Sequence, residues 1–169
     1  MKKIIVLNVM LFSLISFAQT NNVKKTDSFI GSWSLVSITN IYQNGTKVQP
    51  YGEQPDGLLI FDEHGNYAIQ ILKKNRPLIA SGNKNTSTPE ENAEIVKGFN
   101  AHYGYYFIDT GTKTISFNVL HASFPNWENK VQKRTYSYNN DVLKYIVTNT
   151  TQGGKSVVAE VVWKRRVFN

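Results

Sequence analysis

The chain has no cysteine among its 169 residues. This absence excludes a disulfide framework, a thiolate nucleophile, zinc held by cysteine, and a lipid attached to an N-terminal cysteine. Histidine is nearly as scarce, with only three residues, His64, His102 and His121, and no two have the spacing of a metal-binding pair. We therefore expect no metal site and no cofactor. No Gly-x-Ser-x-Gly elbow and no glycine-rich phosphate loop occurs either.

The chain also lacks long runs of one charge. It carries 19 Lys and Arg against 12 Asp and Glu, a formal net charge of +7. The basic residues are scattered or paired, as in Lys24-Lys25, Lys73-Lys74 and Arg165-Arg166. A nucleic-acid-binding surface needs a basic helix or stripe, which this spread does not form. We therefore expect no nucleic acid partner and interpret the charge as a solvated basic surface.

The N-terminus has the three-part organisation of a secretory signal peptide. Residues 1–3 are basic at Lys2 and Lys3, residues 4–17 are mainly apolar, and the small residues Ser16 and Ala18 precede a cleavage point. The apolar stretch is shorter than the roughly 20 residues that a spanning helix needs, so we expect no membrane anchor. The prediction is a signal peptide over residues 1–18 and export to the periplasm or outside the cell.

Removal of that segment lowers the formal net charge from +7 to +5. Residues 19–28 are mostly polar, and we interpret them as a flexible lead-in. The remaining residues, 29–169, fit the size of one domain.

From Phe29 onward the chain consists of short β-type runs separated by turn residues. Turn signals include Asn44-Gly45 and the four residues 63–66. The predicted strands are 31–42, 46–49, 57–62, 67–73, 102–109, 113–120, 131–138, 142–149 and 156–167. Their hairpin spacing indicates an antiparallel meander, whose two edges are best protected by closure. The predicted fold is all-β, a closed up-and-down barrel of about eight or nine strands.

Closure would pair the first strand, which carries Trp33, with the last strand, which carries Trp163. In the last strand the residues Val157, Ala159, Val161 and Trp163 share one face, which we assign to the barrel interior. A barrel of this size holds packed side chains or one small ligand.

One helix interrupts the strands. Thr88-Pro89-Glu90-Glu91 combines a capping threonine, proline at the first helical position and a capping-box glutamate. Ala93, Val96 and Phe99 then recur at helical spacing. The preceding loop, residues 75–87, is the longest irregular segment after the N-terminus. We expect this insertion to lie across one end of the barrel, together with residues 124–127.

Gly31-Ser32-Trp33 in the first strand and Trp163-Lys164-Arg165 in the last resemble the lipocalin, or calycin, signature. The resemblance implies that Trp33 seals the closed base of the barrel and that a basic residue of the last strand packs across it. Arg165 is the better candidate because it shares strand parity with Trp163. A guanidinium over an indole is a cation–π contact that would join the two closing strands.

A wider resemblance covers residues 29–166. The segments GSWSLVS, PYGEQPDGLLIFDEHGNYAIQIL, HYGYYFID and HASFPNWENKVQKRTY are similar, in order and spacing, to the bacterial and fungal lipocalin-like domain family. The resemblance implies a lipocalin-type barrel with a ligand pocket. Most members have no assigned activity, and some accompany natural-product pathways in which binding or cyclisation has been considered.

His121 is the main candidate for a pocket group. It continues the face of Ile115, Phe117 and Val119, so we expect it to point into the barrel. There it would be a hydrogen-bonded core residue, or would orient a polar ligand or act as a general base. The residues expected to contact a ligand are His121, Tyr103, Tyr105, Arg134, Phe124, Asn126 and Trp127.

The segment Phe124-Pro125-Asn126-Trp127 has two interpretations. Its aromatic residues could form a wall at the pocket mouth with Asn126 as a hydrogen-bonding group, or they could cover the barrel end structurally.

Three functional hypotheses follow. The leading one is an exported barrel that binds a small hydrophobic or amphipathic molecule. The second is an isomerase or cyclase that uses His121 in the cavity. The third is a solidly packed barrel that acts as an interaction or inhibitor protein. A cavity above about 300 Å³ separates the first two from the third.

Overall fold

The computed structural model describes residues 27–148, 150 and 157–167. The predicted signal peptide, most of the lead-in and the predicted strand ends at positions 149 and 156 lie outside these described residues. The strands are β1 (Gly31–Ile41), β2 (Lys47–Val48), β3 (Asp56–Phe61), β4 (Asn66–Leu72), β5 (Phe99–Asp109), β6 (Thr114–Ala122), β7 (Lys130–Asn139), β8 (Val142–Val147) and β9 (Val158–Arg165). The helix α1 (Pro89–Lys97) lies between β4 and β5, and 3-10 turns occupy Asp27–Phe29, Lys84–Thr86 and Pro125–Trp127.

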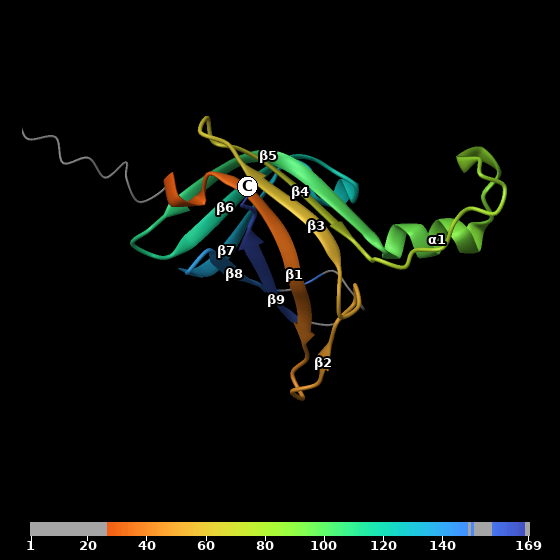
Figure 1. The fold of residues 1–169 in the computed structure, drawn as a ribbon, viewed down its shortest axis with the longest axis horizontal. Coiled ribbons are helices and arrows are strands. Elements are labelled where there is room, and N and C mark those ends of the chain that lie inside the picture. Colours follow the sequence, from red (N-terminus) through yellow and green to blue (C-terminus); the bar gives the residue numbers. More distant parts are fainter. Residues whose placement is uncertain (1–26, 149, 151–156, 168–169) are drawn as a thin grey trace, which may run out of the picture.

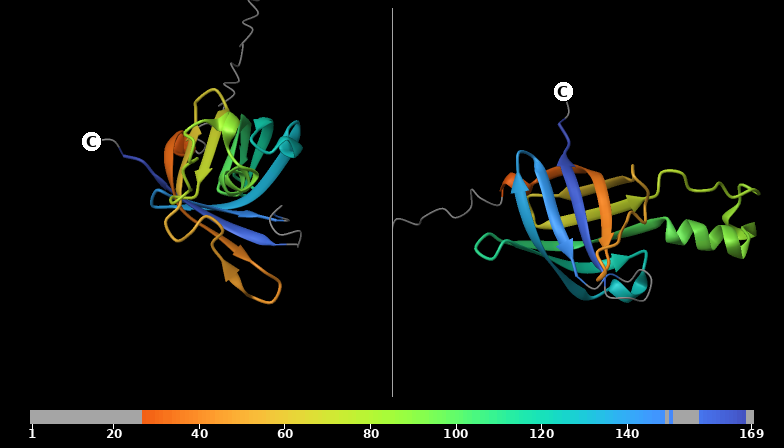
Figure 2. Two further views of the ribbon diagram at one scale, coloured as in Figure 1. Left: turned by 90° about the vertical axis from the view of Figure 1, so that its right-hand side faces the viewer. Right: turned by 90° about the horizontal axis from the view of Figure 1, so that it is seen from below.

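The strands form a closed antiparallel barrel, as Figures 1 and 2 show. Consecutive strands pair from β3 through to β9. β1 closes the cycle by pairing with both β3 and β9. The short strand β2 lies outside this cycle and pairs with the end of β1. The predicted closed meander is therefore confirmed as eight barrel strands and one extra strand.

The closure depends on Trp33 and Arg165, which face each other in the β1–β9 register. The Trp33 side chain is fully buried, and its indole N–H donates to the carbonyl oxygen of Phe29 at 3.0 Å. The guanidinium carbon of Arg165 lies 4.3 Å from the centre of the Trp33 ring. The expected cation–π contact is confirmed, and it joins the first strand to the last.

Arg165 also ties the N-terminal turn to this end of the barrel. Its guanidinium donates to the carbonyl oxygens of Ser28 and Ile30, the latter at 2.8 Å. On the other side, Nε donates to Oδ1 of Asp141 at 2.9 Å. Gly31 lies beneath the guanidinium at φ 127°, where an added Cβ would lie 3.0 Å from Arg165 Nη1. Glycine is therefore required at the start of β1.

Aromatic side chains fill this end of the barrel. Phe29 packs against Tyr136 and Tyr138 with ring centroids 5.1 and 5.3 Å apart, and Trp33 packs against Tyr138 at 5.8 Å. The residues assigned to the interior, Val157 just before β9 and Ala159, Val161 and Trp163 on it, are all buried, which confirms that assignment. The base is a packed core.

The helix begins as predicted, with a complete capping box. The Thr88 hydroxyl oxygen accepts from the Glu91 N–H at 3.2 Å, and a Glu91 carboxylate oxygen accepts from the Thr88 N–H at 2.8 Å. The other Glu91 oxygen accepts from the N–H of Ala80 at 2.8 Å, which joins the helix to the preceding loop.

The expectation that the helix lies across the barrel end is wrong. Residues 73–98 form an arm that projects beyond the barrel (Figures 1 and 2), and no residue of α1 is buried. The β4–β5 ladder continues to the pair Leu72–Phe99, after which Lys73 N–H donates to the Gly98 carbonyl oxygen at 2.9 Å. The paired strands therefore carry the arm outward. Phe99 belongs to β5, not to the helix.

In the described part of the chain, no helix has both the length and the apolar character needed to cross a membrane.

Replacement of Arg165 by Met removes the cation–π contact and leaves two carbonyl oxygens without their charged donor. We expect a loss of about 3 kcal/mol in the free energy of unfolding, measured by urea denaturation. The matched control is Lys164→Met, which removes the same charge from an exposed neighbour on β9. It should change stability by less than about 0.5 kcal/mol. Equal destabilisation by both variants would contradict this role of Arg165.

Candidate ligand-binding cavity

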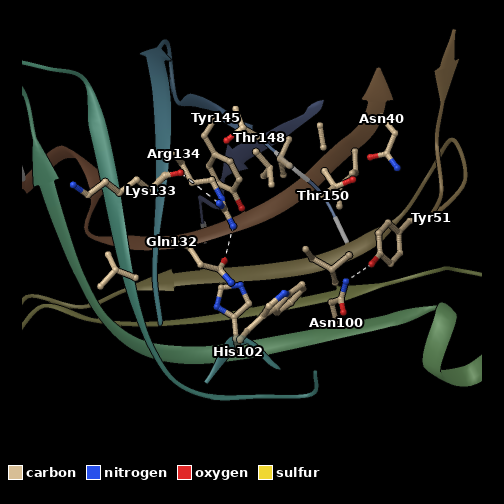
Figure 3. Close-up of a pocket in the computed structure, with 17 residues that line it drawn as sticks. Asn40, Tyr51, Asn100, His102, Gln132, Lys133, Arg134, Tyr145, Thr148 and Thr150 are labelled. Atoms are coloured by element: carbon tan, nitrogen blue, oxygen red, sulfur yellow. Dashed lines mark hydrogen bonds between the residues drawn. The ribbon is translucent and has the colours of Figure 1, made fainter. Parts of the chain in front are cut away.

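A cavity of about 530 Å³ occupies the half of the barrel opposite the Trp33–Arg165 base. Its walls include the end of β4, the start of β5, the end of β8 and the start of β9, all of which meet at the same rim (Figure 3). The lining residues are Ile38, Asn40, Tyr51, Ile71, Asn100, His102, Trp127, Val131, Gln132, Lys133, Arg134, Tyr145, Val147, Thr148, Thr150, Ala159 and Val161. The volume lies within the range of ordinary small-molecule sites.

Arg134 and Gln132 extend from alternate positions of β7 into this cavity (Figure 3). Nη2 of Arg134 donates to Oε1 of Gln132 at 2.5 Å, and Nη1 donates to the carbonyl oxygen of Lys133 at 3.4 Å. Burial lowers the pKa of the Arg134 guanidinium from its ordinary value, yet arginine stays protonated in proteins. The cavity thus contains a fixed positive charge.

His102 lies on the cavity wall with 7% of its surface exposed. Its Nδ1 is 2.9 Å from the hydroxyl oxygen of Tyr67. Burial, and then the charge of Arg134, lowers the pKa of His102 to about 4. Burial raises the pKa of Tyr67. At neutral pH the pair is therefore an uncharged imidazole bonded to an uncharged phenol.

Polar groups also surround the rim. The Asn100 amide nitrogen donates to the hydroxyl oxygen of Tyr51. Burial raises the pKa of Tyr51 to about 12, although the bond from Asn100 opposes this shift. Asn40 is buried on β1, and Thr148 and Thr150 lie close by (Figure 3). These groups can hydrogen-bond a ligand that enters the barrel.

The rest of the lining is apolar or aromatic. Ile38, Ile71 and Val161 are buried against the cavity. Trp127 covers one side with its ring centroid 5.7 Å from that of His102. An amphipathic molecule fits such a surface, because both its apolar and its polar parts find contacts. Among the described residues, no group of three His, Cys, Asp or Glu side chains could hold a metal ion.

The prediction that His121 points into the barrel is wrong. The β5–β6 register pairs Tyr103 with His121 but Gly104 with Val119, so Leu120 is an extra residue in β6. Such a bulge shifts the alternation of side chains by one position. The His121 side chain is consequently 64% exposed on the outer surface, with Nδ1 3.5 Å from a Glu128 carboxylate oxygen.

Tyr103 and Tyr105 were expected at the ligand, but both lie on the outer surface with 51% exposure. The buried positions of β5 are His102, Gly104 and Ile108. Gly104 was the feature of the sequence that could have revealed the bulge, because glycine inside a strand often marks one. A Cβ at this position would lie 2.0 Å from the carbonyl oxygen of Asn118.

Within the segment Phe124–Trp127, only one aromatic residue fits the interpretation as a wall of the pocket. Trp127 lines the cavity, whereas Phe124 and Asn126 are exposed and do not. Phe124 instead packs edge-on against Trp127 at 5.5 Å. Arg134 lies in the cavity as expected, and ligand contact at Arg134 and Trp127 stays a prediction.

Several cavity groups were not among the predicted ligand contacts, chiefly His102, Gln132, Tyr145 and Asn100. Gln132 shares strand parity with Arg134, which was the signal that could have placed it. His102 could have been placed once the interior face of its strand was known. Asn100 precedes the predicted start of that strand, so no strand parity could be assigned to it.

His102 should make stability depend on acidity. Its pKa of about 4 lies below the ordinary 6.5, so between these values the unfolded chain binds a proton that the folded chain does not. Neutral His102 therefore contributes about 3 kcal/mol to the free energy of unfolding above pH 6.5. This contribution is lost as the pH falls to 4. Urea denaturation at pH 7 and pH 4 measures the loss. His102→Gln should reduce it and His121→Gln should leave it intact. An undiminished loss in His102→Gln would exclude His102 as its source.

The comparison with protein families matches the lipocalin-like domain over residues 30–166. No curated protein matches the chain. The family match spans the whole described barrel, from the start of β1 past the end of β9. The chain therefore belongs to the lipocalin-like domain family.

Proposed function

We propose that this protein is exported and binds a small, mainly apolar molecule with a few polar groups in the barrel cavity. The observation that supports binding best is the cavity of about 530 Å³ in the half of the barrel away from the packed base. A solidly packed interaction barrel is disfavoured, because the volume exceeds the roughly 300 Å³ at which ordinary ligand sites begin. Catalysis by His121 is disfavoured as well, because that side chain is on the outer surface.

The cavity is suited to one ligand per chain. Its apolar wall, which includes Val147, Ala159 and Val161, can bury the body of the ligand. The groups at the rim and on β7 can orient its polar part. The lipocalin-like family membership supports small-molecule binding in general terms.

Binding can be tested with N-phenyl-1-naphthylamine, a neutral apolar dye that fluoresces when it leaves water. We expect saturable binding of one dye per mature chain, residues 19–169. Ala159→Phe places a larger side chain in the cavity and should weaken dye binding at least tenfold. The matched control, Val158→Phe, adds a ring at the neighbouring exposed position of β9 and should bind the dye like the unaltered protein.

Thermal melts of both variants would identify a loss that comes from unfolding. An absence of saturable dye binding to the unaltered protein, or equal binding by the folded Ala159→Phe variant, would refute the cavity as the binding site.

Export rests on the three-part pattern of residues 1–18. Intact mass spectrometry of the protein recovered outside the cytoplasm of producing cells should give the mass of a chain that starts at Gln19. Full-length protein confined to the cytoplasm would contradict export.

A further inference from the structure

Arg134 places a positive charge inside the cavity without a negative partner among the described residues. Arginine has five N–H donors, and the two hydrogen bonds of this guanidinium go to the neutral oxygens of Gln132 and Lys133. None of the ion pairs among the described residues involves Arg134. The contrast with Arg165 is direct, since Arg165 pairs with Asp141.

The groups around Arg134 do not supply the missing negative charge. Tyr67 on β4 and Tyr145 on β8 are buried phenols, and burial raises the pKa of both, so they stay protonated. His102 on β5 is a neutral imidazole at pH 7. No Asp or Glu lines the described cavity. A charge removed from water is costly unless an opposite charge compensates it.

The neighbouring donors extend this positive site. Figure 3 shows Gln132 between Arg134 and His102. Because Oε1 of Gln132 accepts from Arg134, the amide nitrogen of Gln132 remains as a donor in the cavity. Nδ1 of His102 is bonded to Tyr67, and Nε2 has no partner among the described residues. If Tyr67 donates to Nδ1, Nε2 carries the proton and is a further donor.

We infer that the bound molecule is an amphipathic organic anion whose negatively charged oxygen group pairs with Arg134. This inference rests on the proposed binding function and specifies its ligand class. The guanidinium, held in place by Gln132, offers the planar N–H pair that a carboxylate or sulfonate accepts. The apolar body of the ligand lies against the Ile71, Val147 and Ala159 side of the cavity. Neutral apolar molecules of the same shape enter the cavity but leave Arg134 uncompensated.

Two dyes with one aromatic skeleton test the charge preference. N-phenyl-1-naphthylamine is neutral, and 8-anilino-1-naphthalenesulfonate carries one added sulfonate. Fluorescence titration of the mature chain at pH 7 should give at least tenfold tighter binding of the anionic dye. The preference should decrease as salt is added, because part of it is a charge interaction reached through an open rim.

The decisive variant is Arg134→Met, which keeps an unbranched side chain but removes the charge. It should bind the anionic dye at least tenfold more weakly than the unaltered protein does and so lose the preference for the anionic dye over the neutral one. Lys164→Met removes one positive charge from the exposed face of β9 and should retain the full preference. This control separates a local contact from the effect of net charge. Urea denaturation identifies a variant that has lost its fold.

The outcomes separate the two proposals. Equal affinities of the unaltered protein for the two dyes, or a preference that persists in folded Arg134→Met, would overturn the anionic ligand while the binding function stands. Failure of both dyes to bind saturably would remove the binding function and this inference together. Should Arg134→Met be unfolded, Arg134→Gln serves in its place with the same expected loss.

Discussion

The fold depends on the guanidinium of Arg165 lying across Trp33. This one side chain, near the end of the chain, contacts the indole of the first strand, the carbonyl oxygens of the N-terminal turn and the carboxylate of Asp141 between β7 and β8. A meander without the β1–β9 pairing that this contact stabilises would have two open edges, each a row of unpaired backbone groups. Closure removes those edges and encloses the interior in which the cavity lies.

The interior has two regions with different physical character. Near Arg165, aromatic rings including Phe29, Trp33 and Tyr138 are in mutual contact and fill the space. Toward the rim the side chains are smaller or polar, and the space stays open. Arg165 at the packed base and Arg134 in the open cavity also differ in how their charges are compensated. Arg165 is compensated by a carboxylate of its own chain, whereas Arg134 has none among the described residues.

Most of the fold could be predicted because its signals are local. Turn residues mark the hairpins, and Trp33, Trp163 and Arg165 mark the closing strands. The orientation of His121 could not be obtained this way, because it depends on one extra residue at Leu120 and on Gly104 in the partner strand. Arg134 and His121 were both expected to contact the ligand, but the two lie on opposite faces of the sheet. The direction of the arm depends on backbone pairing beyond the barrel, which periodicity does not encode.

The separation of a packed base from an open rim has an evolutionary consequence. Substitutions at Gln132, Ala159 or Thr148 alter the shape and polarity of the cavity without touching the Trp33–Arg165 contact. Under the proposed binding function, lineages can exchange one ligand for another while the scaffold keeps its fold, since the Trp33–Arg165 contact lies at the opposite end. A family with this layout is expected to diverge fastest around the rim and slowest around the base.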